Sequence, residues 1–462
     1  MFRKQTSGSF ERSFKYEILA RAPALYIYIS ASYHDRLTWF EEVFFLAGKS
    51  GVADFFIRYR TVMKLGISAL VIAGTADLFA GILLGQMEDY LNLIPGMMIL
   101  IYSAIGMRGN IFGAMGSRIG TAMNIGTFEM SLRKGTVLRA NVESAMILTS
   151  VMSIAMGVTT WIVAELFFDG TVSVWDFIFI STVGGVVAGA IVMMVNILIA
   201  YVGNKREWDV DNITAPLISA VGDIVTMPMI FVSTWLFFTV TDMEIGETIM
   251  IVTSVALIVA TAILSVYVLT RKTSKRDFSG EAKRICVQSL PVLLACLIFE
   301  IGAGVTIQDQ QDALIEYAVL LIMLPAFLNQ GNALSGMLTS RISSMIHLGT
   351  LETKGYPGKG ALENFVVMYI CAMITFLYIG LISFGATILT SGTSNLSVLT
   401  SIAIILIAGF LATTILNILS YYVAVAATRF GLDPDDHCIP ITSSVMDMLG
   451  SMVLVMIIGF FI

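Results

Sequence analysis

The chain has 462 residues, of which 57 % are hydrophobic and only 13 % are charged, with a formal net charge of −6. A soluble globular protein keeps roughly a quarter of its residues charged, so this composition excludes a soluble domain and indicates a protein whose surface mostly faces lipid. The cysteines are scattered, which argues against a disulfide framework or a thiolate metal site: Cys286, Cys296, Cys371 and Cys438.

Residues 1–64 form a polar, charged segment ahead of the first long apolar stretch. The segment lacks the apolar core of a cleavable signal peptide, so we expect the first spanning helix to direct insertion. Residues 37–60 mix aromatic and charged side chains, a pattern typical of an amphipathic helix at the inner membrane interface. We therefore predict a cytoplasmic N-terminal segment that contains one amphipathic helix.

Long apolar stretches follow along the rest of the chain. A helix needs about 20 apolar residues to cross the roughly 30 Å hydrocarbon layer, and by this criterion we predict about eleven spans. The second and eighth contain an internal Gly-Asn pair, so we expect these two helices to be broken or partly re-entrant. The predicted spans are 65–85, 91–124, 142–167, 177–202, 213–240, 247–270, 288–307, 314–347, 362–390, 398–427 and 437–461.

The basic residues are distributed unevenly over the connections between these spans. Every Lys and Arg except Arg108 falls before the first span or in an even-numbered connection, whereas the odd-numbered connections carry acids such as Glu88 and Asp169. Lysine and arginine mark the cytoplasmic side of a membrane protein. We therefore predict a cytoplasmic N-terminus and an external C-terminus, in a cell membrane.

Two segments of the chain recur in the same order. GMRGNIFGAMGSRIGTAMNIGTFE (106–129) resembles NQGNALSGMLTSRISSMIHLGTLE (329–352), and DVDNITAPLISAVGDIV (209–225) resembles DPDDHCIPITSSVMDML (433–449). Each repeat covers five predicted spans, and one additional span lets both repeats enter the membrane in the same direction. We predict an all-α polytopic membrane protein of two parallel five-helix repeats, divided into an N-terminal segment, a first repeat, a linking helix with a basic loop, and a second repeat: 1–64, 65–240, 241–287 and 288–462.

Four acidic residues lie near the middle of predicted spans: Asp77, Asp223, Glu300 and Asp447. Asp223 stands about eleven residues into its span, or about 16 Å deep, and Asp447 matches it in the second repeat, as Glu300 matches Asp77. A carboxylate at the bilayer centre is costly and usually faces a protein interior or a water-filled path. We predict that these acids bind a cation; the alternative is structural acids that are neutral or paired with Arg108.

Oxygen ligands suit a hard cation, and Mg²⁺ commonly combines one or two carboxylates with several waters. We expect Asn110 and Asn332 to contribute side-chain or backbone oxygens, with close helix packing as the alternative role. Further acids are expected at the cytoplasmic mouth, where they would concentrate cations or cap the last helix of each repeat: Asp209, Asp211, Asp433 and Asp435.

At these motifs the chain resembles the MgtE-type magnesium channels and the related solute-carrier magnesium transporters. The most specific elements are the segments at 209–225 and 433–449, which look like the family segment whose mid-helix aspartate binds the permeating Mg²⁺. The resemblance implies that role for Asp223 and Asp447. Bacterial members form homodimers of five-helix subunits with cytoplasmic CBS domains; the two fused repeats found here are similar to the solute-carrier branch instead.

Together these features predict a transporter of divalent cations, most of all Mg²⁺, rather than an enzyme. The aspartate segments lack the YD and GxGD motifs of intramembrane aspartyl proteases, and an ion-coupled carrier of a small organic solute is the alternative function. We expect no prosthetic group and no nucleic-acid partner, and a monomer that acts as a pseudo-dimer in the lipid bilayer. The sequence leaves open Mn²⁺, Ca²⁺ or Co²⁺ as cargo, Na⁺ or H⁺ as coupling ion, and a channel against an exchanger.

Overall fold

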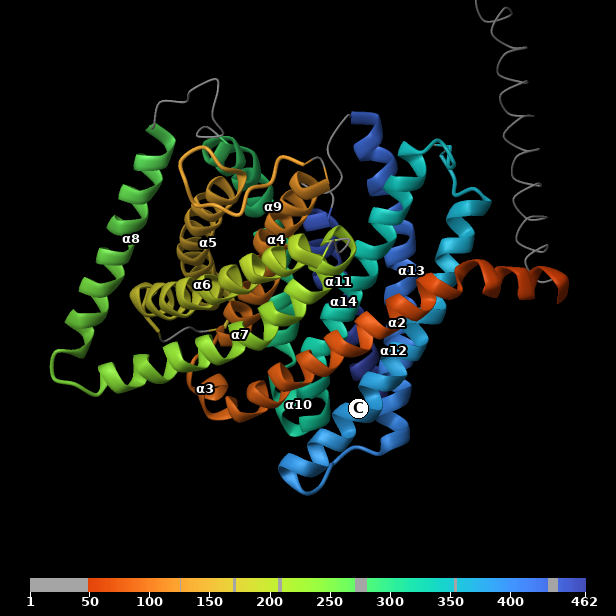
Figure 1. Cartoon of the computed structure of the whole chain (residues 1–462). Coiled ribbons are helices and arrows are strands. Elements are labelled where there is room, and N and C mark those ends of the chain that lie inside the picture. Colours follow the sequence, from red (N-terminus) through yellow and green to blue (C-terminus); the bar gives the residue numbers. More distant parts are fainter. Residues whose placement is uncertain are drawn as a thin grey trace, which may run out of the picture.

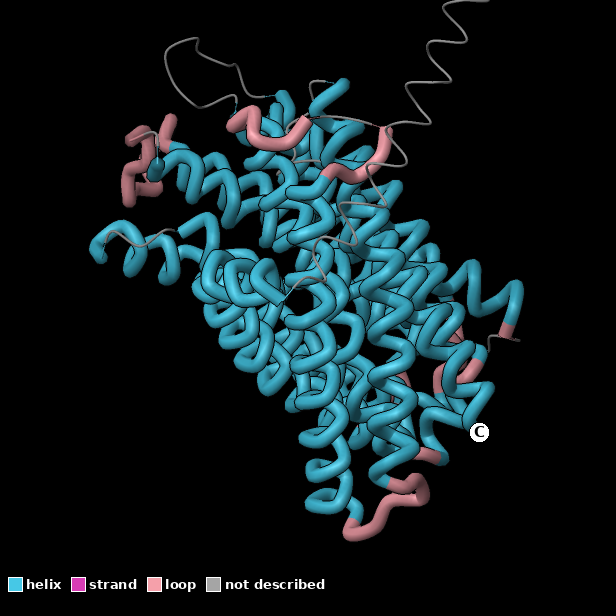
Figure 2. The backbone as a smooth tube through the Cα atoms, turned by 90° about the vertical axis from the view of Figure 1, so that its right-hand side faces the viewer, coloured by secondary structure: helices cyan, strands magenta, loops and turns pink. Residues whose placement is uncertain are grey.

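The protein is described by a computed structural model, which covers residues 49–124, 126–168, 172–206, 210–270, 281–352, 355–430 and 439–462. Within these ranges the regular structure is entirely helical, and the connecting segments are short (Figure 1 and Figure 2). Long apolar runs favour this outcome, because a helix satisfies all of its backbone hydrogen bonds internally, as a lipid environment requires.

The helices form two sets with the same order. The first repeat contains α2 (Lys49–Gln86), α3 (Glu88–Leu93), α4 (Met97–Asn124), α5 (Val137–Phe167), α6 (Val174–Arg206) and α7 (Val210–Thr241). The second repeat contains α9 (Glu281–Asp309), α10 (Gln311–Glu316), α11 (Ala318–His347), α12 (Lys359–Ser391), α13 (Val398–Phe430) and α14 (Ile439–Phe461). Helix α8 (Gly246–Thr270) links them.

The predicted number of spans is confirmed. In the described part of the chain, 11 helices are long and apolar enough to cross a membrane, so the chain is an integral membrane protein. The predicted amphipathic helix over 37–60 lies partly outside the described residues. Its remaining part, 49–60, is the beginning of α2, which continues without interruption into the first span.

The prediction that the Gly-Asn pairs break their helices is wrong. Helices α4 and α11 run continuously through Gly109-Asn110 and Gly331-Asn332. The interruptions lie earlier, where the short helices α3 and α10 end before the long helices begin. A glycine inside a helix costs only about 1 kcal/mol relative to alanine, and dense packing offsets this cost, because 78 % of the apolar window of each long helix is buried.

The two repeats exchange their first helices. Helix α2 of the first repeat packs on α11 and α12 of the second, and α9 of the second repeat packs on α4 and α5 of the first. The closest approaches are at equivalent positions: Gly81 lies against the carbonyl of Ile322, and a Cβ on Gly304 would stand 2.6 Å from the Cα of Ile99. The repeats therefore interlock, and helices from both surround the centre of the molecule.

Two arginines tie neighbouring helices together in the same way in each repeat. Arg118 Nε donates to Asn141 Oδ1 at 2.8 Å, and Arg341 Nε donates to Asn364 Oδ1 at 2.7 Å. Each asparagine in turn donates to a carbonyl one turn earlier in its own helix. These contacts give the Ser-Arg elements of the repeat a structural role.

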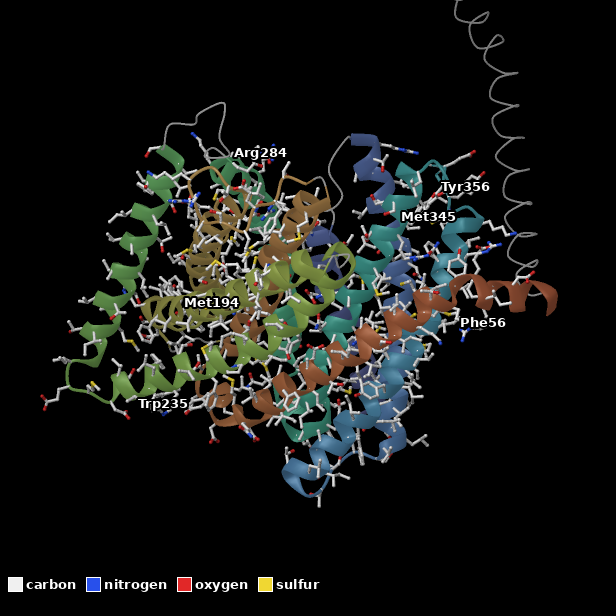
Figure 3. All side chains as sticks on the ribbon, in the orientation of Figure 1. Phe56, Met194, Trp235, Arg284, Met345 and Tyr356 are labelled. Carbon is white, nitrogen blue, oxygen red and sulfur yellow. The ribbon has the colours of Figure 1, made fainter. Side chains whose placement is uncertain are left out.

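Helix α8 lies at one edge of the molecule, apart from the two repeats (Figure 1). Only 11 % of its apolar window is buried, in contrast to 78 % for α4 and α11. Large apolar side chains are also exposed elsewhere on the outer surface, including Met194 and Trp235 (Figure 3). An apolar exterior of this kind matches a lipid surrounding, which makes α8 a peripheral span.

Candidate cation site

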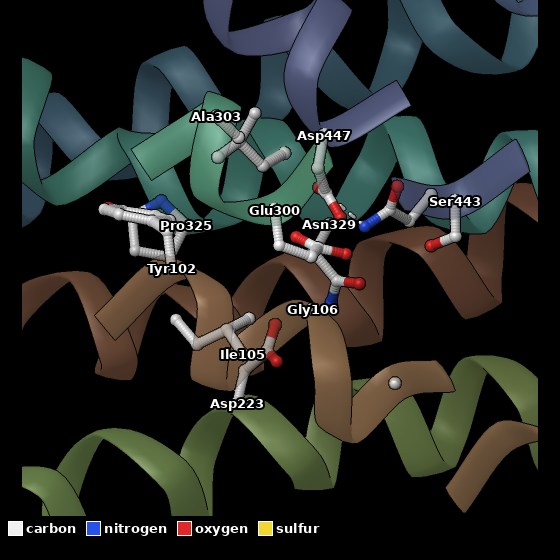
Figure 4. Close-up of a pocket in the computed structure, with 13 residues that line it drawn as sticks. Tyr102, Ile105, Gly106, Asp223, Glu300, Ala303, Pro325, Asn329, Ser443 and Asp447 are labelled. Atoms are coloured by element: carbon white, nitrogen blue, oxygen red, sulfur yellow. Dashed lines mark hydrogen bonds between the residues drawn. The ribbon is translucent and has the colours of Figure 1, made fainter. Parts of the chain in front are cut away.

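The four acids predicted from the sequence lie at the centre of the interlocked repeats, on α2, α7, α9 and α14. All are buried, with exposed fractions of 0 % for Asp77, 4 % for Asp223, 1 % for Glu300 and 6 % for Asp447. Figure 4 shows Asp447 and Glu300 close to each other, with Asp223 facing them from α7. Asp77 and Glu300 reach this place on α2 and α9, which pack on helices of both repeats.

The acids form two equivalent pairs. Asp77 and Asp223 lie on α2 and α7, which pack against each other, and Glu300 and Asp447 lie on α9 and α14, which also pack against each other. Each pair joins the first and last span of one repeat. Asp223, Glu300 and Asp447 line one cavity, so the two pairs meet at one place.

Amide and hydroxyl groups orient these carboxylates. Asn329 Nδ2 donates to Asp77 Oδ2, and Asn332 Nδ2 donates to Asp447 Oδ1, each at 2.8 Å. Glu300 Oε1 accepts from Ser444 Oγ at 2.7 Å, and that hydroxyl accepts from Asn110 Nδ2 at 2.8 Å. Both Gly-Asn asparagines therefore act through their side chains, not through freed backbone carbonyls.

A cavity of about 30 Å³ lies between the acids, with room for about two water molecules. Glycine at position 106 permits this geometry, because a Cβ there would overlap the Glu300 carboxylate. The residues that line the cavity are Tyr102, Ile105, Gly106, Gly109, Asp223, Glu300, Ala303, Pro325, Leu328, Asn329, Asn332, Ser443 and Asp447. Four of the six predicted ligands line the cavity. Asp77 and Asn110 do not line it: Asp77 accepts from Asn329, and Asn110 donates to Ser444.

Unpaired oxygens distinguish this cavity. Each of the four acids keeps one buried carboxylate oxygen that has no hydrogen-bond donor in the described part of the chain, and so does the side-chain oxygen of Asn332. A buried polar atom without a partner costs about 1–3 kcal/mol. Four of these acceptors belong to residues that line the cavity, Asp223, Glu300, Asp447 and Asn332, and oxygen atoms are the ligands that a hard cation prefers.

The acids do not form a compact, ready-made ligand cage. Within the described residues, no three His, Cys, Asp or Glu side chains stand close enough together to hold a metal ion.

The predicted cytoplasmic mouth stays a prediction. Asp209, Asp433 and Asp435 lie outside the described residues, and Asp211 is described only as part of the backbone of α7. Their closeness in sequence to the last helix of each repeat is the observation that supports this assignment.

Sequence reasoning missed two residues that contact the acids. Asn329 aligns with Met107 in the first repeat, and Ser444 aligns with Ala220. Comparison of the repeats therefore hid them, although a polar residue in the middle of a span is itself a signal. Ser444 also stands one turn before Asp447 on the same face of α14, a spacing at which helical side chains are neighbours.

Comparison with known proteins supports the repeat and the chemistry. Residues 101–233 and 324–457, one segment in each repeat, match the family model for the MgtE divalent cation transporters. The chain belongs to the MgtE family of divalent cation transporters. It is a membrane transporter of divalent cations and not an enzyme.

Curated relatives carry the name solute carrier family 41. Member 3 from Mus musculus is 22 % identical over 86 % of this chain and 82 % of its own length. Member 2 is 23 % identical in Gallus gallus, covering 85 % of this chain and 70 % of the relative, and 22 % in Homo sapiens, covering 83 % and 68 %. No solved structure matches the chain significantly.

Proposed function

We propose that this MgtE-family protein carries Mg²⁺ across a cell membrane through the central cavity, with Asp223 and Asp447 as the residues that contact the ion. Glu300 faces the same cavity, and Asp77 supports Asp223 from behind. The observation that carries this proposal is the set of unpaired acceptor oxygens around one buried cavity. A carboxylate from each repeat approaches the ion from opposite sides.

Mg²⁺ fits this arrangement for two reasons. The site offers only oxygen atoms, which suit a small hard cation. Mg²⁺ also gives up its waters reluctantly and commonly uses one or two carboxylates, with waters in the remaining positions. The amide oxygen of Asn332, which lines the cavity and lacks a hydrogen-bond donor among the described residues, is a further candidate contact.

The size of the cavity implies movement during transport. At about 30 Å³ it holds about two waters, which is too little for an ion with its full hydration shell. Helices from both repeats line it, so a change in how the repeats pack would widen it. We infer that the present conformation is one in which the path is closed around the site.

The remaining features of the proposal come from the sequence. The distribution of lysine and arginine supports a cytoplasmic N-terminus and an external C-terminus. The division into 1–64, 65–240, 241–287 and 288–462 follows the repeat. Since both halves of the site lie on one chain, we expect a monomer to transport on its own, with the mouth acids Asp209, Asp211, Asp433 and Asp435 concentrating cations at the entrance.

Flux measurements in proteoliposomes test the function. The double variant Asp223→Asn/Asp447→Asn should lose Mg²⁺ flux by about 100-fold or more, since removal of two charge-assisted contacts costs several kcal/mol. Glu363→Gln is the matched control: this buried acid accepts from Tyr59 and Arg58 and lies outside the cavity, so its flux should equal that of wild type.

Three outcomes separate the alternatives. Wild-type liposomes that pass no divalent cation but accumulate an organic solute would contradict the proposal. Full flux in the double variant would place the ion path elsewhere. The wild-type measurement is repeated with imposed Na⁺ and H⁺ gradients. In an exchanger the Mg²⁺ flux follows the imposed Na⁺ or H⁺ gradient, whereas in a channel it follows only the electrochemical gradient of Mg²⁺ itself.

A further inference from the structure

A buried arginine stands beside the cation site in the first repeat alone. Arg108 on α4 is only 3 % exposed. Its Nη1 donates to Thr226 Oγ1 at 2.6 Å and its Nη2 to the carbonyl of Gly185 at 3.1 Å, so two helices fix the guanidinium in place. Its Nε has no acceptor among the described residues.

The positive charge of Arg108 acts on Asp223. Thr226, which anchors the guanidinium, follows Asp223 by three residues on α7, so the side chains of these two residues lie on one face of that helix. The ion pairs found in the described residues do not include these two side chains. Asp223 thus feels a nearby positive charge while one of its oxygens stays without a donor in the described structure.

The second repeat has no such charge at the equivalent position. Gln330, which aligns with Arg108 in the sequence, is buried but donates to the carbonyl of Leu70 on α2 at 2.7 Å. Along the continuous helices α4 and α11, where Arg118 corresponds to Arg341, the position that corresponds to Arg108 is Gly331, which is also uncharged. The two halves of the site consequently carry the same acids but differ by one full positive charge.

We propose that Arg108 is a fixed countercharge of the cation site, which weakens the hold of Asp223 on the ion and thereby allows a single divalent cation to leave. The inference rests on the proposed function and concerns the balance between binding and release. Four carboxylates without a countercharge would hold a divalent cation tightly, and a transport site needs binding weak enough to permit exit. A guanidinium suits the task because it stays charged at any physiological pH.

The test compares charge with shape at one position. Arg108→Gln removes the charge and keeps hydrogen-bond donors, whereas Arg108→Lys keeps the charge. Mg²⁺ affinity is measured by calorimetry on the purified full chain, and Mg²⁺ flux in proteoliposomes. We expect Arg108→Gln to bind Mg²⁺ about tenfold or more tightly than wild type and to transport it more slowly, and Arg108→Lys to resemble wild type in affinity.

A second variant keeps the test decisive if Arg108→Gln fails to fold. Arg108→Met removes the charge with a side chain of similar length and should likewise bind Mg²⁺ about tenfold more tightly than wild type. Unchanged or weaker binding in whichever of these two uncharged variants folds would overturn the countercharge. If wild type itself neither binds nor transports Mg²⁺, the proposed function fails, and that result is separate from a failure of the countercharge alone.

Discussion

The two halves of the cation site share their acids but differ in what surrounds them. In the first repeat, Asp77 accepts from Asn329 and Asp223 lies near Arg108. In the second, Glu300 accepts from Ser444 and Asp447 accepts from Asn332. The acids kept their positions in both copies while their neighbours diverged. The comparison separates what the ion requires, a carboxylate on each side, from what can be tuned, the charge and donors around it.

We expect the largest loss of stability at the two helix crossings that recur in both repeats. Gly81 and Gly304 form equivalent close crossings with helix backbones, so valine at either position cannot be accommodated without separating two helices. We expect Gly81→Val and Gly304→Val each to destabilise the protein by about 3 kcal/mol or more, in the range of severe packing changes. Thermal unfolding in detergent measures this.

Gly336→Ala serves as the control for both variants. Nothing lies within 4 Å of a Cβ at this helical glycine, and alanine favours a helix over glycine, so its unfolding temperature should stay the same or rise. A tolerated valine at one crossing and not at the other would show that the two interlocking contacts are energetically unequal despite their equivalent positions.

The aspartates should reveal the asymmetry of the site. Asp447 has no arginine at the position that corresponds to Arg108, so it should hold the ion more strongly than Asp223. We expect Asp447→Asn to lower Mg²⁺ flux by about 100-fold and Asp223→Asn by about tenfold, a difference of about 1.4 kcal/mol. Flux assays on the single variants, normalised to folded protein, measure both. Equal losses would indicate that the ion binds midway and that the surroundings matter little.

We expect the smallest difference in Mg²⁺ affinity between variants of the two asparagines that contact the acids. Both asparagines line the cavity. Asn332 donates to Asp447 and has an oxygen without a donor in the described structure, whereas Asn329 donates to Asp77, which does not line the cavity. A hydrogen bond to a charged group contributes about 1.5–3 kcal/mol. We expect Asn332→Ala to weaken Mg²⁺ binding about tenfold and Asn329→Ala about threefold, measured by calorimetry. A larger loss with Asn329→Ala would mean that Asp77 contacts the ion directly.

Much of the fold follows from the sequence because the membrane allows few alternatives. Apolar runs long enough to cross can only be helices, and these spans agree with the structure. The four acids could be found because a carboxylate at mid-membrane is costly and because each recurs in the other repeat. Their convergence is visible only in the structure, since nothing in the sequence pairs α2 with α11 or α9 with α4.

The sequence reasoning failed where tertiary packing decides. Gly109 and Gly331 suggested broken helices, yet burial keeps α4 and α11 continuous. Asn329 and Ser444 escaped because their repeat counterparts, Met107 and Ala220, are apolar. Comparison of the two repeats in the sequence thus finds the site residues that both halves share, but it does not find the site residues that only one half contains.

Because each first helix packs on helices of the other repeat, the fold can be completed only after the second repeat has been synthesised. Asp77 and Asn329 are separated by 252 residues. At about 5–20 residues per second, a ribosome needs roughly 13–50 s to make the partner of this carboxyl group. During that interval the first repeat is incomplete, because α11 and α12, which pack on α2 together with α7, belong to the second repeat. We therefore expect neither half to mature without the other, and two separately made halves to assemble only when both are present in the same membrane.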